Sequence, residues 1–167
     1  GKFSTVNAAR IAWMGSAKLP DKTITDAWGT QEWVHFLEGM PDTLAQAQLT
    51  QLDEAYRFTG TPNGEIAMRW YPLAERSGYA AARPAMGAFL ERVGRRKLIM
   101  PTYKALVATP DGLAFAKAVF AKARPGYHPI TTGSVEAMIA EAKPMERQEV
   151  PEALHPVDPA PQPAPTK

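Results

Sequence analysis

Residues 41–78, PDTLAQAQLTQLDEAYRFTGTPNGEIAMRWYPLAERSG, contain the clearest indication of the fold class. Apolar side chains recur here at intervals of three or four residues, which is the spacing of one face of an α-helix. The first set is Ala45, Leu49, Leu52, Ala55 and Tyr56, and the second is Ile66, Trp70 and Leu73. Asp42 and Asn63 precede these sets and are good N-cap residues, while Gly78 is a natural helix stop. The segment therefore predicts two helices with a short connection between them.

The same helical spacing continues on both sides of this segment. It predicts further helices around Val6–Met14, Trp33–Met40, Met86–Val93, Ile99–Leu106, Leu113–Phe120 and Val135–Ala142. No segment alternates apolar and polar residues for long enough to predict a strand. Short connections favour antiparallel neighbours, and the pairs 42–78, 79–109 and 110–143 have the length of helical-pair repeats. The sequence therefore predicts an all-α fold and favours a stacked superhelix of helix pairs over a closed bundle.

The composition is that of one globular domain. The chain has 167 residues, of which 45% are hydrophobic and 22% charged, and this suffices for a buried core. It has no cysteine, which excludes disulfides, thiolate zinc sites and cysteine nucleophiles. With only three histidines, any metal site would be poor. No apolar run has the length of a membrane span and no signal-peptide pattern opens the chain, so we expect no membrane partner and a cytoplasmic location. A formal net charge of +2 lacks the dense basic stripe of a nucleic-acid-binding protein.

Proline divides the chain into a domain, residues 1–143, and a tail, residues 144–167. Seven of the 16 prolines lie in the tail, which has no glycine. The run from Pro159 to Pro165 excludes a helix or an inner strand, because each proline removes a backbone donor. We predict a flexible Pro-rich tail with few core contacts, so that truncation after Lys143 leaves the melting temperature nearly unchanged. A Pro156-x-x-Pro159 ligand for an aromatic groove is the alternative.

The sequence lacks the common catalytic motifs. It contains no H-E-x-x-H, no Gly-rich phosphate loop, no G-x-S-x-G elbow and no dinucleotide fingerprint. His35 and Glu38 are spaced as two metal ligands on one helix face, although such a pair is more often simply exposed. We therefore predict that this chain alone is not an enzyme and holds no metal or other cofactor.

The cluster Gly94-Arg95-Arg96-Lys97 carries the most specific chemical prediction. If Gly94 ends one helix and the next begins near Leu98, Arg95 and Lys97 lie on extended backbone, where residues two apart point the same way. Arg96 then points away from them. The start of the following helix adds unpaired N–H groups, so Arg95 and Lys97 are predicted to bind a carboxylate. One alternative is a solvated basic connection. The other is RNA binding through Arg92, Arg95, Arg96 and Lys97, which without interleaved aromatics would have at most non-specific affinity for phosphate.

Four motifs, in order, resemble the C-terminal helical domain of leukotriene A-4 hydrolase and related zinc aminopeptidases. They are Tyr56-Arg-Phe58, Asn63-Gly-Glu-Ile-Ala-Met-Arg69-Trp70, Gly94-Arg95-Arg96-Lys97 with Pro101 and Lys104, and His128-Pro129-Ile130-Thr131. The resemblance extends from about Thr25 to Thr131, and the chain continues for 36 residues beyond it. It implies a right-handed superhelix of antiparallel helix pairs, similar to armadillo and HEAT repeats.

The resemblance also implies a function. In that family the catalytic zinc belongs to a preceding domain, so we expect zinc in the parent's catalytic domain and none here. The family's Arg-x-Lys pair, Arg95 and Lys97 in this sequence, reaches the interdomain cleft and binds the free carboxylate of a peptide or lipid substrate. The chain is thus expected to be a non-catalytic domain, excised from a longer zinc aminopeptidase, that walls the active-site cleft. Its expected partners are the catalytic domain and a peptide carboxylate.

Two further motifs and one alternative function remain from the sequence. Arg69-Trp70 and His128-Pro129 lie beside predicted helix ends and are expected to be packing and chain-turn features. A freestanding helical-repeat module that binds a partner protein is the alternative to the peptidase domain.

Overall fold

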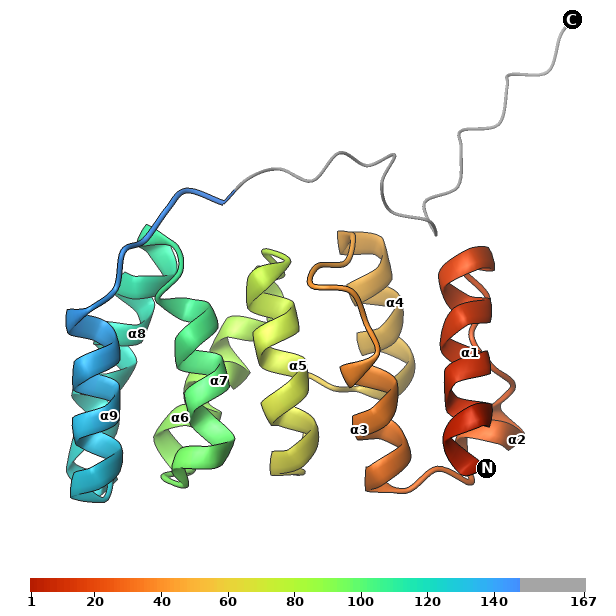
Figure 1. Ribbon diagram of the computed structural model, residues 1–167, viewed down its shortest axis with the longest axis horizontal. Coiled ribbons are helices and arrows are strands. Elements are labelled where there is room, and N and C mark those ends of the chain that lie inside the picture. The colour runs from red at the N-terminus through yellow and green to blue at the C-terminus, as the bar shows by residue number, and fades with distance from the viewer. Residues whose placement is uncertain (148–167) are drawn as a thin grey trace, which may run out of the picture.

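The computed structural model describes residues 1–147, a range that contains helices and no strand (Figure 1). The helices are α1 (Lys2–Ser16), α2 (Lys22–Thr25), α3 (Thr30–Glu38), α4 (Gln46–Tyr56), α5 (Gly64–Arg76), α6 (Arg83–Arg92), α7 (Arg96–Leu106), α8 (Pro110–Ala123) and α9 (Pro129–Ala140). Two short 3-10 helices, η1 (Ala80–Ala82) and η2 (Arg124–Gly126), lie in the connections. The all-α prediction is therefore confirmed for these residues. Residues 148–167, with the Pro156-x-x-Pro159 segment, lie outside the described part of the chain.

The helices are stacked in chain order in two layers. α1, α3, α5, α7 and α9 form one row in which each helix contacts the next (Figure 1). α4, α6 and α8 lie behind this row in the same view, and α6 contacts α8. This arrangement agrees with the predicted superhelical stack. The handedness and the likeness to armadillo or HEAT repeats stay predictions.

One cluster of buried side chains forms the core between the layers. The largest fully buried side chains are Trp13, Trp70, Tyr71, Tyr103, Phe36, Phe89, Leu49, Leu52, Leu73, Met86, Leu90 and Ile99. Trp70 Nε1 donates to Thr59 Oγ1 at 3.0 Å, and Trp13 Nε1 donates to Gln51 Oε1 at 2.8 Å. Both buried indoles are therefore hydrogen-bonded, as burial of a polar N–H requires. Apart from Ala55, which is exposed, the apolar residues predicted on helix faces in residues 41–78 are buried or half-buried.

Two of the three helix-limit signals predicted in residues 41–78 are confirmed, and one is wrong. Asn63 caps α5 as predicted, because its side-chain oxygen accepts hydrogen bonds from two backbone N–H groups of the first turn. Gly78 has a φ of 73°, a left-handed conformation that a side chain disfavours, and α5 ends just before it. The prediction that Asp42 caps α4 is wrong. That helix begins later in the chain, and the Gln48 side chain accepts from the Ala45 N–H instead, at 2.8 Å.

Three helices of the front row have their N-terminal ends at one edge of the domain. Asn63, just before α5, donates from Nδ2 to Thr30 Oγ1 at the start of α3, at 2.9 Å. A Cβ added at Gly64, the first residue of α5, would lie 3.0 Å from Leu98 Cδ1 in the first turn of α7. We call the first turns of α3, α5 and α7, with the residues that cap them, the N-terminal edge.

The residues after α9 run back across the stack. The Met145 N–H donates to the Ala108 carbonyl, just after α7, at 2.9 Å. Arg147 donates from one guanidinium nitrogen to the Glu75 carbonyl in α5, at 3.2 Å. The first residues of the predicted tail therefore contact the domain, whereas the boundary at residues 143 and 144 stays a prediction.

Candidate functional site

The predicted binding residues lie at the start of α7, on the N-terminal edge. α7 begins at Arg96, and Arg95 is its N-cap residue with φ −73° and ψ 113°. The prediction that this helix begins near Leu98 is wrong, because Arg96 and Lys97 already belong to its first turn. The connection from α6 is therefore short, and Arg95 and Lys97 do not share one extended segment.

The start of α7 is rich in positive charge and has no acid of its own. Arg95, Arg96 and Lys97 are exposed, and the first turn of α7 has no acidic residue. By contrast, the first turns of α3, α5 and α8 each contain one. Cations at a helix N-terminus lie at the positive end of the helix dipole, which is the unfavourable arrangement. An external anion would stabilise this end of α7.

The three basic side chains differ in what they contact. Lys97 Nζ lies 3.4 Å from Glu65 Oε1 on α5. Arg96 Nε donates to Ser134 Oγ on α9 at 2.9 Å, on the other side of α7. The Arg95 guanidinium has no hydrogen-bond or ion-pair partner among residues 1–147. Of these three cations, Arg95 is thus the one without a partner in the described part of the chain, and Lys97 has one loose contact, with Glu65.

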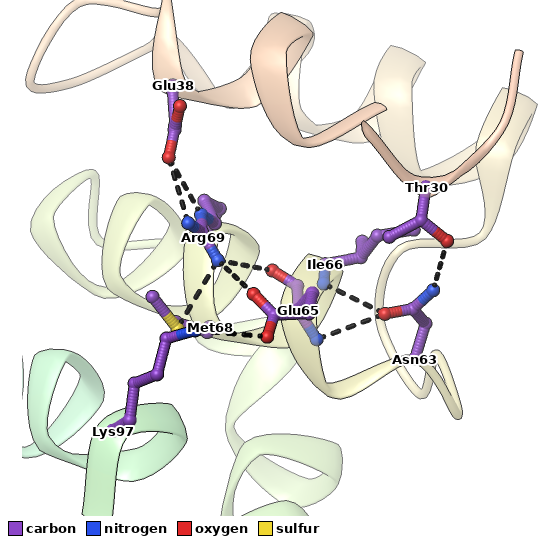
Figure 2. Close-up of polar contacts among 8 residues, drawn as sticks. All are labelled: Thr30, Glu38, Asn63, Glu65, Ile66, Met68, Arg69 and Lys97. Carbon is purple, nitrogen blue, oxygen red and sulfur yellow. Dashed lines mark hydrogen bonds and ion pairs between the residues drawn. The ribbon is translucent and has the colours of Figure 1, made fainter. Parts of the chain in front are cut away.

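A chain of ion pairs connects Lys97 to α3 through α5 (Figure 2). Arg69 NH1 lies 2.8 Å from Glu65 Oε2, and its Nε and NH2 lie 3.0 and 2.9 Å from Glu38 Oε1. The other carboxylate oxygen of Glu65 is the one that contacts Lys97. The Arg69 side chain is only 19% exposed, so its charge interacts more strongly than a fully solvated one would. We call Glu38, Arg69, Glu65 and Lys97 the salt-bridge network.

The motif Asn63-Gly64-Glu65 fixes the position of the salt-bridge network on α5. The Asn63 side chain caps the helix and donates to Thr30, so the starts of α5 and α3 are joined (Figure 2). Gly64 has no side chain, and this lets Leu98 of α7 approach the α5 backbone closely. Glu65 follows directly, in the first turn of α5, where a carboxylate is favoured by the helix dipole. The three residues together set the distance over which Glu65 reaches Lys97.

Hydrogen bonding keeps Glu65 ionised. The Arg69 guanidinium donates to the carboxylate and lowers the pKa of Glu65 below its ordinary value, and Lys97 acts in the same direction. Desolvation raises this pKa but is outweighed by the Arg69 hydrogen bond. Glu65 is therefore a carboxylate at neutral pH, and the formal charges of the four residues of the salt-bridge network cancel. Arg95 and Arg96 then give the start of α7 its net positive charge.

Two motifs that the sequence assigns to structural roles have different outcomes. His128 is the N-cap residue of α9, and its Nδ1 accepts from the Ile130 N–H at 3.1 Å, which confirms a structural role. Arg69 is more than a packing residue, because it holds carboxylates of two helices. The spacing of Glu65 and Arg69, four residues apart on one helix, is the sequence signal that predicts half of this contact.

His35 and Glu38, the pair spaced as metal ligands, are each in contact with other side chains. His35 Nε2 lies 3.0 Å from Asn7 Oδ1 and its ring stacks on Phe3, while Glu38 pairs with Arg69. Among residues 1–147, no group of three or more His, Asp or Glu side chains is placed to hold a metal ion. In the same range, no helix is both long enough and apolar enough to cross a membrane.

The described residues thus form an all-helical stacked domain that exposes a basic helix start at one edge. The family model described as leukotriene A4 hydrolase, C-terminal, matches residues 28–139, which is more than half of the chain. The chain therefore belongs to this family of C-terminal domains.

Individual relatives agree with this family. Leucine aminopeptidase 2 of Pyricularia oryzae is 29% identical over 127 residues, covering 74% of this chain and 20% of the relative. Leucine aminopeptidase 2 of Yarrowia lipolytica is 30% identical over 82 residues, covering 49% and 12%. The leukotriene A-4 hydrolase homolog of Botryotinia fuckeliana is 25% identical over 132 residues, covering 77% and 20%. The chain thus spans about a fifth or less of the length of these relatives.

Proposed function

We propose that this chain is the C-terminal domain of a zinc aminopeptidase, and that Arg95 and Lys97 bind the free carboxylate of the peptide substrate. The observation that carries the proposal is the start of α7. It exposes three cations without an acid of its own, and Arg95 has no partner in residues 1–147. Membership of the family and the aminopeptidase relatives support the parent enzyme.

The two cations have complementary roles. Arginine presents a planar fork of N–H donors that matches the two oxygens of a carboxylate, whereas lysine supplies a compact point charge. Arg95 would therefore fix the direction of the carboxylate, and Lys97 would add attraction from the α5 side. The backbone N–H groups at the start of α7, which no side chain caps, would also favour an anion there.

Holding the far end of a peptide helps a reaction that takes place elsewhere. A substrate fixed at its carboxylate has fewer orientations, so its scissile bond is aligned for attack more often. In this proposal the zinc ion is held by residues outside this chain and supplies the Lewis acid for hydrolysis. The domain contributes a wall of the cleft and the carboxylate-binding cations, and it contributes no reacting group.

Direct binding to the 167-residue chain tests the proposal. The chain is titrated with a tripeptide and with its carboxyl-amidated form at constant ionic strength, and the backbone N–H signals of residues 95–97 are followed by NMR. We expect saturable shifts with the free acid and none with the amide. Arg95→Ala should abolish the difference, and Arg96→Ala, the matched control, should leave it. Identical titrations with acid and amide would refute carboxylate recognition.

A further inference from the structure

We propose that Glu65 is a positioning residue for carboxylate recognition, because it holds the Lys97 ammonium group in place. Glu65 is itself held by the rest of the salt-bridge network, which begins at Glu38 on α3. This inference rests on the proposed function, because it assumes that Lys97 contacts the substrate carboxylate. It goes further in assigning a role to residues that do not themselves touch the substrate.

The salt-bridge network determines which carboxylate oxygen of Glu65 faces Lys97. Arg69 NH1 contacts Oε2 of the Glu65 carboxylate at 2.8 Å and also donates to the Glu65 backbone carbonyl at 3.2 Å (Figure 2). The side chain and the backbone of Glu65 are therefore both held by Arg69. Oε1 is left toward α7, 3.4 Å from Lys97 Nζ. Arg69 is itself held by two contacts with one oxygen of Glu38. The direction of the Glu65 carboxylate is therefore set by three helices and not by its own rotamer preference alone.

Lys97 has few other restraints. Its side chain is 58% exposed, and Glu65 is its only hydrogen-bond or ion-pair partner among residues 1–147. A lysine side chain is long and loses much rotamer freedom when it is held in one position. An ammonium group has three donors, so one contact with Glu65 leaves donors for an incoming carboxylate. The one contact with Glu65 thus restricts the position of the ammonium group and leaves its other N–H donors free for a substrate carboxylate.

The negative charge of Glu65 does not make it a simple competitor of the substrate. Arg69 already balances this charge at 2.8 Å, closer than the 3.4 Å to Lys97. An incoming anion therefore still meets a net positive field, to which the exposed Arg95, Arg96 and Lys97 all contribute. A competitor role predicts stronger carboxylate binding when Glu65 loses its charge, whereas the positioning role predicts weaker binding. The two roles have opposite signs and are separable by experiment.

The test uses the full-length polypeptide that contains this domain, assayed on a tripeptide and its carboxyl-amidated form. The measured quantity is the ratio of kcat/KM for the free acid to kcat/KM for the amide. Lys97→Ala should lower this ratio about tenfold, the low end for a charge-assisted hydrogen bond. Glu65→Gln should lower it about threefold, because the ammonium stays but loses its anchor. The double variant should fall no further than Lys97→Ala alone. Glu54→Gln, an exposed acid on α4, is the matched control.

Each outcome decides a different claim. An unchanged or raised ratio in Glu65→Gln, with a lowered ratio in Lys97→Ala, overturns the positioning role and leaves the proposed function intact. An unchanged ratio in Lys97→Ala overturns both. Glu65→Asp serves as a second variant if Glu65→Gln does not fold, since it keeps the charge and shortens the reach toward Lys97. It should lower the ratio as well, and an unchanged ratio there contradicts positioning. Equal losses on both peptides in either Glu65 variant indicate a structural role only.

Discussion

Replacing Glu75 should destabilise the domain more than any other single charge change in it. The Glu75 side chain is 4% exposed in α5, and its two oxygens accept from Arg83 Nε and NH2 at 3.1 and 2.6 Å. Breaking a buried pair from one side typically costs about 3–5 kcal/mol, because the remaining charge is left uncompensated. Arg83 keeps a second partner, Asp111, at 2.8 Å, which moderates this loss. We therefore expect Glu75→Gln to cost about 3 kcal/mol, the low end of that range.

Urea denaturation of the 167-residue chain measures this cost, and thermal unfolding checks it. A loss of about 3 kcal/mol corresponds to a fall in Tm of about 6–12 °C for a domain of this size. Asp111→Asn is the matched control, because Asp111 binds the same arginine but its side chain is 60% exposed. Its cost should stay below about 1 kcal/mol. A Glu75→Gln variant within about 0.5 kcal/mol of the wild type, or no less stable than Asp111→Asn, would refute the assignment of Glu75 as a buried structural charge.

Three further predictions concern the cap, the tail and the tyrosines. Asn63→Ala should cost about 2 kcal/mol in urea denaturation, about one for the cap and one for the bond to Thr30; Asn63→Asp, which keeps the cap, should cost clearly less. Truncation after Lys143 removes Arg147 and should cost about 1 kcal/mol rather than nothing, matched by Arg147→Ala; a much larger cost for truncation would contradict this. All five tyrosines have a raised pKa, chiefly through burial, and that of Tyr79 is raised to about 12. The folded state therefore keeps these protons above the ordinary pKa, so the free energy of unfolding should fall as the pH rises from 10 toward 12, and phenolate absorbance that appears at pH 10 without unfolding would disprove it.

Most of the helices and the cap at Asn63 could be predicted from the sequence, because both depend on residues close together in the chain. The cap predicted at Asp42 is wrong, and the four-residue helix α2 was not predicted. The set Ile66, Trp70 and Leu73 is buried or half-buried along α5, as its spacing predicts. Asn63 acts on N–H groups two and three residues ahead, so its role follows from its own type and position. Such features need no knowledge of how the helices stack.

The first residue of α7 and the salt-bridge network could not be predicted in this way. No side chain caps α7, so no local signal marks its first residue, and packing of Leu98 against Gly64 contributes to its position. Lys97 lies 32 residues from Glu65 in sequence, and Arg69 lies 31 from Glu38. The stacking of α3, α5 and α7 alone brings these charges together. A motif comparison identifies Arg95 and Lys97, but the partners that hold Lys97 appear only in the structure.

Carboxylate binding at the start of α7 is tested most directly by the effect of Arg95→Ala on the full-length polypeptide, measured as kcat/KM on free and carboxyl-amidated tripeptides. A charge-assisted hydrogen bond is worth about 1.5–3 kcal/mol, so we expect about a tenfold to hundredfold loss on the free acid and little change on the amide. Arg96→Ala, which removes the same charge from the neighbouring position, should change neither peptide much because its side chain lies toward Ser134. Equal losses on both peptides, or equal effects of the two arginine variants, would contradict carboxylate binding at the start of α7.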